Sequence, residues 1–153
     1  MKKLVSLVLA CAAVTLTVPA SAQFAKPEDA IKYRQGVMFI MAQNFGRVAA
    51  MVQAKAPFDA KLAAESAANA EFMSKLPWAA FGEGTEKGSI PTRAKPEIWS
   101  DKAKFNEYAE KMQSEMVKFN AAAKTGSLDN IKAAMGAVGG SCKACHDAFQ
   151  AKL

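Results

Sequence analysis

Two cysteines and a histidine near the C-terminus have the types and the spacing to do chemistry together. Cys142, Cys145 and His146 belong to the run Cys-Lys-Ala-Cys-His at 142–146, and C-x-x-C-H is the attachment pattern of c-type haem. On a helix, positions separated by three and four residues share one face. Both thiols can then add across the vinyl groups of one haem while the imidazole faces its iron. The motif predicts one haem c, covalently attached through Cys142 and Cys145, with His146 as metal ligand.

Other uses of this motif fit the chain less well. A structural zinc site takes four ligands, commonly two pairs of Cys or His, whereas this chain has three cysteines and one histidine. A thioredoxin-like dithiol needs a surrounding βαβ pattern, and the sequence contains no strand signal. A structural disulfide between the two cysteines stays open, but it would leave the adjacent histidine without a role.

The N-terminal segment has the pattern of a secretory signal peptide. Two lysines precede the apolar run Leu4 to Val18, and Ala20-Ser21-Ala22 is an A-x-A cleavage site. We expect residues 1–22 to be removed, leaving one domain at 23–153 without membrane insertion. The less favoured lipoprotein alternative would acylate Cys11, but Leu9 stands where a small residue is needed. Export and haem attachment together predict a periplasmic protein.

The charge of the chain is moderately basic. The formal net charge is +6, and losing Lys2 and Lys3 with the signal peptide leaves +4. Because the lysines are scattered rather than massed, the pattern predicts a solvated surface and no nucleic-acid partner. A patch that docks an acidic, unidentified redox partner remains an alternative.

Apolar residues three and four positions apart predict helices on both sides of a long loop. The first helix begins at Pro27 and should end near Ala56, because Pro57 disfavours helix in the residue before it. Asp59 should cap a second, alanine-rich helix that reaches about Leu76. The loop at 77–99 contains glycines and prolines, yet its large aromatics predict that it is ordered: Trp78, Phe81 and Trp99.

Two further helices follow this loop. Ser100 is predicted to cap the third, and Ser127 the fourth. Apolar residues in the fourth alternate in steps of three and four, the pattern of a bundle seam: Leu128, Ile131, Met135, Val138, Cys142, Cys145 and Phe149. Three glycines in this helix are expected to leave room for the macrocycle, with a helix break as the alternative: Gly136, Gly139 and Gly140. The chain therefore predicts an all-α fold, an antiparallel up-down-up-down four-helix bundle with haem on the last helix.

His146 is the only histidine, which excludes bis-histidine ligation within one chain. The iron is then five-coordinate or closed by a methionine. In this bundle the start of the first helix lies opposite the end of the fourth, which places Met38 and Met41 near the haem. Four other methionines are predicted to lie too far away or in the wrong place: Met51, Met112, Met116 and Met135. Such an apolar pocket offers no donor for bound dioxygen and no acid or base for cleaving peroxide, so we do not expect an enzyme.

Several motifs across the chain resemble the cytochrome c′ family of class II c-type cytochromes. They are Lys32-Tyr33-Arg34-Gln35, Leu76-Pro77-Trp78-Ala79-Ala80-Phe81-Gly82, Pro96-Glu97-Ile98-Trp99 and Ser141 to Asp147. The resemblance covers essentially all of residues 23–153. It implies a homodimer built from the first two helices, and a high-spin, five-coordinate haem that binds nitric oxide and carbon monoxide.

The resemblance also implies roles for individual residues. Met38 matches the residue over the iron, which is often leucine in relatives, and Arg34 and Gln35 match positions near a haem propionate. From the residues alone, a surface ion pair is an equally good interpretation of Arg34. Phe81 and Trp78 match the pocket wall, and Arg93 and Lys95 could reach a propionate from the loop.

Two departures from the family pattern bear on function. Gln150 stands where close relatives often have a basic residue, four positions after the ligand histidine, which puts the behaviour of nitric oxide on that side in doubt. Methionine replaces leucine at position 38, and low-spin class II members ligate iron with a methionine from this region. The alternative function is therefore a low-spin His/Met electron carrier with Met38 as sixth ligand.

Overall fold

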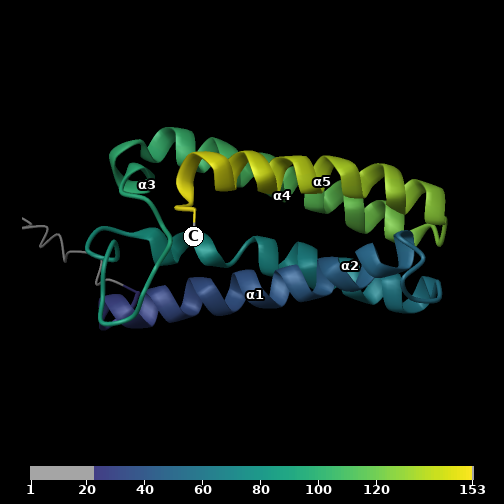
Figure 1. Cartoon of the computed structure of the whole chain (residues 1–153), viewed down its shortest axis with the longest axis horizontal. Coiled ribbons are helices and arrows are strands. Elements are labelled where there is room, and N and C mark those ends of the chain that lie inside the picture. The colour runs from purple at the N-terminus through teal and green to yellow at the C-terminus, as the bar shows by residue number, and fades with distance from the viewer. Residues whose placement is uncertain (1–22, 153) are drawn as a thin grey trace, which may run out of the picture.

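The chain folds into four long helices arranged as two antiparallel pairs (Figure 1). The computed structural model describes residues 23–152, and the predicted signal peptide lies outside them. The long helices are α1 (Pro27–Val52), α2 (Ala60–Ser74), α4 (Lys102–Lys124) and α5 (Leu128–Phe149); two short ones, η1 (Pro77–Phe81) and α3 (Glu97–Ser100), lie in the long connection. The turns α1–α2 and α4–α5 lie at one end, and the long connection lies at the other (Figure 1). The predicted four-helix bundle is confirmed.

Most of the predicted helix ends agree with the structure, and the differences have local causes. Asp59 and Ser127 cap α2 and α5 by accepting hydrogen bonds from backbone N–H groups. The prediction for Ser100 was wrong, because this residue ends the short helix α3 and Asp101 caps α4 instead. Helix α1 stops at Val52 rather than near Ala56. Ala54 has a left-handed backbone conformation, with φ at 53°. It turns the chain out of the helix before the position at which Pro57 would have ended it.

The alanines of α2 lie inside the bundle. Ala63, Ala67 and Ala70 are completely buried, which allows α2 to pack closely against both α1 and α4. Larger side chains from the other helices complete this core, among them Val48, Met116, Phe119, Ile131 and Val138. Packing within one bundle, the favoured interpretation of the alanine-rich segment, therefore accounts for these positions.

Helix α5 continues without interruption through its three glycines. The alternative of a helix break was therefore wrong. Gly136 and Gly140 are exposed, and neither is among the residues that line the cavity beside the two cysteines, so the expectation that they make room there gains no support. Glycine costs a helix up to about 1 kcal/mol relative to alanine, and nothing in the structure explains its use at these two positions.

The long connection is ordered, as its aromatic residues predicted. The indole Nε1 of Trp78 donates to the carbonyl of Ser74 at 2.7 Å, and that of Trp99 donates to the carbonyl of Gly82 at 2.8 Å. The connection also lies against the start of α1. A Cβ atom at Gly88 would lie only 3.1 Å from the backbone nitrogen of Glu28, so a larger residue there would push against the backbone at the start of α1.

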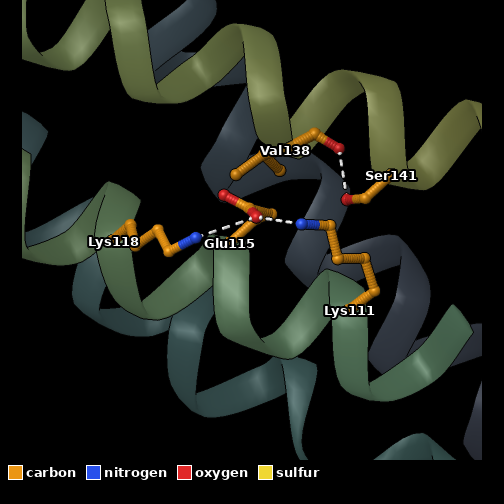
Figure 2. Close-up of polar contacts among 5 residues, drawn as sticks. All are labelled: Lys111, Glu115, Lys118, Val138 and Ser141. Atoms are coloured by element: carbon orange, nitrogen blue, oxygen red, sulfur yellow. Dashed lines mark hydrogen bonds and ion pairs between the residues drawn. The ribbon is translucent and has the colours of Figure 1, made fainter. Parts of the chain in front are cut away.

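A buried carboxylate links two lysines on α4 beside helix α5 (Figure 2). The Glu115 side chain is only 6% exposed, and its Oε1 accepts hydrogen bonds from Lys111 Nζ at 2.7 Å and Lys118 Nζ at 3.0 Å. These two hydrogen bonds hold the pKa of Glu115 below its ordinary value. Because a depressed carboxyl pKa favours folding only while the group is ionised, this contribution should depend on pH.

We expect the stability contributed by Glu115 to be complete above the pKa of the unfolded chain, about 4.3. It should be lost as the pH falls through the lower pKa of the folded state. Urea unfolding of the holoprotein between pH 7 and pH 3 measures this, with Glu115→Gln reducing the pH dependence. Glu110→Gln, which changes an exposed carboxylate of the same helix, is the control. Equal pH dependence in the two variants would contradict the expectation.

Residues 23–152 contain no helix that is both long and apolar enough to cross a membrane. Over the same residues, no group of three or more His, Cys, Asp and Glu side chains gathers as a metal site, so the zinc alternative gains no support. The backbone pairing within this range is limited to one isolated antiparallel bridge between Ala94 and Gln150. A thioredoxin-like βαβ unit is therefore not formed by these residues.

Candidate haem site

One cavity of about 250 Å³ is lined by residues of α1 and α5 and by residues of the long connection. Helices α1 and α5 contact each other much less than the neighbouring pairs do, which leaves this space between them. All eight side chains predicted for the site line the cavity: Arg34, Gln35, Met38, Phe81, Arg93, Cys142, Cys145 and His146. The antiparallel arrangement thus brings together residues that lie more than a hundred positions apart in the sequence.

The Cys-His motif presents neutral groups to this cavity. Burial raises the pKa of the Cys142 thiol, and burial together with Cys142 raises the pKa of Cys145 to about 11. Partial burial and the positive charge of Arg93 lower the pKa of His146, which favours the neutral imidazole that binds metals. Both cysteines are free rather than joined in a disulfide. The surroundings therefore suit two uncharged thioethers and a neutral nitrogen ligand.

Three methionines line the cavity. Met38 and Met41 come from α1, as predicted from their height in the bundle. Met112 of α4, which was predicted to lie too far away or in the wrong place to ligate the iron, lines the cavity as well. Helix α4 packs along α5, and its middle turns therefore reach the floor of the cavity. Sequence spacing alone did not predict which space Met112 would face.

Arg34 is buried and is 3% exposed, which rules out a surface ion pair. Its Nη1 donates to the carbonyl of Ala80 at 2.8 Å and to that of Thr85 at 3.0 Å, and Nη2 donates to Thr92 Oγ1 at 3.3 Å. The guanidinium also lies 4.6 Å from the centre of the Phe81 ring, within cation–π range. Arg34 therefore ties the long connection to α1 from inside the cavity wall.

The other polar residues predicted near a propionate are also engaged with the backbone. Gln35 Nε2 donates to the carbonyl of Pro91 at 2.9 Å, and Arg93 Nε donates to that of Ala151 at 2.9 Å. Lys95 Nζ lies 3.1 Å and 3.0 Å from the carbonyl oxygens of Asp147 and Ala148. Contact of these groups with a propionate stays a prediction, whereas their contacts to the chain are part of the fold.

Aromatic rings form one wall of the cavity. Trp78 and Phe81 belong to the resemblance described above, and the structure adds Phe105 of α4 and Phe149 of α5. The ring of Phe105 lies 4.9 Å from that of Phe81 and 5.3 Å from that of Phe149, both edge to face. Phe149 was predicted as an inward-facing position of the last helix. Spacing along each helix did not predict that Phe105 and Phe149 would meet at the site.

These residues fit a covalently attached haem. The two sulfurs and the imidazole line the same apolar cavity, and the lowered pKa of His146 favours the neutral imidazole that ligates iron. Arginine side chains lie on the same lining, where they can face carboxylates. The structure thus supplies attachment points, a metal ligand and an apolar enclosure in one place.

Comparisons with known proteins agree with this fit. A sequence profile of the family described as Cytochrome C′ matches residues 29–150. The chain is 55% identical over 130 residues to cytochrome c′ of Rubrivivax gelatinosus, covering 85% of this chain and all of the relative. It is 53% identical over 133 residues to cytochrome c′ of Alcaligenes xylosoxydans xylosoxydans, covering 85% of this chain and 99% of the relative.

A solved structure is also similar over nearly the whole described range. It is the nitric oxide complex of a leucine-to-alanine variant of cytochrome c prime from Alcaligenes xylosoxidans. The TM-score is 0.79 at 50% identity, covering 86% of this chain and all of the other. The chain therefore belongs to the cytochrome c′ family, and its cofactor is haem c attached covalently through Cys142 and Cys145.

Proposed function

We propose that the protein is a periplasmic haem protein that binds nitric oxide or carbon monoxide and exchanges one electron with an unidentified redox partner. The observation that carries the proposal is that Cys142, Cys145, His146 and Met38 line one and the same apolar cavity. The haem supplies an iron centre that binds a diatomic gas and changes its oxidation state by one electron. In this proposal His146 is the only protein ligand, and the iron is five-coordinate and high-spin.

The remaining side chains of the cavity limit which ligand is favoured. Met38 and Met41 approach from α1, so the face away from His146 is apolar and sterically restricted. The donor groups of Arg34 and Gln35 already bond to carbonyls of the long connection. Dioxygen depends on a hydrogen-bond donor more than nitric oxide or carbon monoxide does, which supports the proposed choice of ligands. The nitric oxide complex of a similar protein gives independent support.

The same lining argues against an enzyme that cleaves peroxide. Such chemistry needs an acid or base within hydrogen-bond reach of the substrate. Among the described residues, no carboxylate lines the cavity and its only imidazole is His146, which is committed to the iron. We therefore propose that the protein acts as a gas-binding and electron-transferring haem protein rather than as a catalyst.

A second candidate function rests on the methionines of the cavity. Thioether sulfur is a common axial ligand in c-type sites, and Met38, Met41 and Met112 all line this space. If Met38 ligates the iron, the protein is a low-spin electron carrier that does not bind gases readily. The two candidates differ in whether the position facing Met38 is open.

Substitution of Met38 separates a steric lid from a ligand. We expect Met38→Ala to raise the association rate of carbon monoxide with the ferrous protein about tenfold, because removing the side chain lowers a steric barrier by about 1.4 kcal/mol. Stopped-flow mixing measures the rate. Met73→Ala, which changes a partly buried methionine outside the cavity, should leave it within about twofold. An unchanged rate in Met38→Ala would contradict a lid at this position.

Export and processing are part of the proposal. We infer that residues 1–22 are removed and that the domain at 23–153 receives its haem in the periplasm. Intact mass measurement of the protein from a periplasmic extract tests this. A mass corresponding to a chain that starts at Gln23 with one haem would support the inference, and recovery of the full-length chain in the cytoplasm would contradict it.

The exposed apolar residues support the proposed homodimer. Phe39 of α1 is 63% exposed and Phe72 of α2 is 59% exposed, and both belong to the two helices from which the resemblance described above implies that the homodimer is built. We expect the wild-type holoprotein to sediment as a dimer and the double variant Phe39→Lys/Phe72→Lys to sediment as a monomer. Analytical ultracentrifugation measures both. A wild-type monomer at micromolar concentration, or a dimeric double variant, would contradict the proposed interface.

A further inference from the structure

The last turn of α5 has an unusual cap. An α-helix leaves its last four carbonyl groups without partners in the helix, and in α5 these belong to residues 146–149. The N–H of Gln150 donates to the carbonyl of His146 at 2.9 Å. Lys95 satisfies the other three: its ammonium donates to Asp147 and Ala148, and its backbone N–H donates to Phe149 at 3.0 Å.

This cap comes from a distant part of the chain, unlike the caps of the other long helices. At the end of α4, the carbonyls of Ala122 and Ala123 accept bonds from Thr125 and Gly126, which directly follow the helix. In α5, by contrast, one residue more than fifty positions earlier in the chain provides three of four bonds. Its positive charge also lies at the negative end of the α5 dipole, where a cation is favourable.

Lys95 is itself held in place from both sides. Residues 92–95 run antiparallel to residues 149–151, and we call this pairing the terminal clasp. In it the N–H of Ala151 donates to the carbonyl of Arg93 at 2.8 Å, and Ala94 and Gln150 form the isolated bridge. At its start, Thr92 accepts a hydrogen bond from the buried Arg34. A connected set of contacts thus joins α1 to the end of α5.

The turn that Lys95 caps is the turn that carries His146. We propose that Lys95 is a positioning residue: by fixing the last carbonyls of α5 it sets the orientation of the His146 imidazole toward the haem iron. The proposal rests on His146 being the iron ligand, and it holds whether the sixth position is open or filled. Without the cap, the last turn opens and the imidazole samples a wider range of tilts.

Two readouts on the holoprotein test the proposal, and neither requires gas binding. Amide hydrogen exchange at residues 149–151 reports whether the turn opens. The hyperfine-shifted proton NMR signals of the His146 ring in the ferric protein report its geometry at the iron. In Lys95→Met we expect exchange to be at least about tenfold faster, with the His146 signals shifted or broadened. Lys95→Arg, which keeps donors and charge, should restore both.

Lys143→Met is the matched control. Lys143 is also a lysine near the end of α5, and it pairs with the carboxylate of Asp147 rather than with the backbone carbonyls. Its replacement removes the same charge without removing the cap, so exchange should change less than about twofold. Equal effects in Lys95→Met and Lys143→Met would overturn the proposal, because charge alone would then explain them.

Three further outcomes would also overturn it. Fast exchange with unchanged His146 signals would make the cap structural only. Unchanged exchange with shifted propionate signals would mean that Lys95 contacts a propionate in the holoprotein. Unchanged amide exchange together with unchanged His146 signals would show that Lys95 neither stabilises the last turn nor positions the imidazole. If Lys95→Met does not accumulate, Lys95→Ala, which also removes the side-chain donors to Asp147 and Ala148, carries the same test. Failure of the wild-type protein to bind carbon monoxide would refute the proposed function and leave this comparison intact.

Discussion

Replacing Phe105 with alanine should lower the free energy of unfolding of the holoprotein by about 4 kcal/mol, the largest change expected for one side chain. Phe105 is 2% exposed and lies within 5.7 Å, ring centre to ring centre, of Trp78, Phe81 and Phe149. Truncation leaves a cavity where η1, in the long connection, meets α4 and α5. Because three rings lose an edge-to-face neighbour, the surrounding structure cannot easily fill that space.

Urea unfolding monitored by circular dichroism measures the effect of Phe105→Ala. Phe58→Ala is the control, since Phe58 lies in the turn between α1 and α2 and is 38% exposed. We expect the control to cost less than about 1.5 kcal/mol. A loss below about 1.5 kcal/mol for Phe105→Ala would show that the aromatic wall does not stabilise the fold.

Replacing Arg34 with methionine is expected to cost about 3 kcal/mol. The change leaves the carbonyl oxygens of Ala80 and Thr85 without their charged donor, and each unsatisfied buried acceptor costs about 1–3 kcal/mol. Part of this loss is offset if Thr85 Oγ1, which already donates to Ala80 at 3.2 Å, bonds more strongly. The cation–π contact with Phe81 is lost as well.

Arg34→Lys distinguishes charge from geometry at this position. Lysine keeps the charge but cannot reproduce the planar fork that reaches three residues of the long connection, so we expect it to recover less than half of the loss. Arg47→Met is the control for an exposed arginine, whose Nη1 bonds to Asn44 and Ser66; it should cost less than about 1 kcal/mol. Equal stability of Arg34→Met and wild type in urea unfolding would contradict the anchoring role.

The features that could be predicted from the sequence are those that depend on local spacing. Steps of three and four residues identified the inward faces of the helices, because a helix repeats every 3.6 residues. The side chains of Asp59 and Ser127 marked two helix starts, because a cap bonds to the N–H groups next to it. The motif at 142–146 predicted the cofactor because all of its reactive side chains lie within about one helical turn, so that local spacing alone identifies it.

The features that could not be predicted depend on contacts between distant segments. Ser100 and Asp101 are both good caps, and only the extra helix α3 decided between them. Met112 lines the haem cavity because of how α4 packs on α5. The resemblance placed Arg34 near the haem, whereas its actual hydrogen bonds go to the carbonyls of Ala80 and Thr85. The hydrogen-bond partners of a buried donor such as Arg34 are known only when the fold of the long connection around it is known.

The optical spectrum of the ferrous protein before and after carbon monoxide tests the central claim most directly. The proposed five-coordinate site predicts a broad, unsplit visible band that shifts readily when carbon monoxide is added, with Met38 as a steric lid. A sharp α band that resists carbon monoxide would contradict the claim, because a thioether would then occupy the sixth position. In that case Met38→Leu should restore the open site, and the protein would be a His/Met electron carrier.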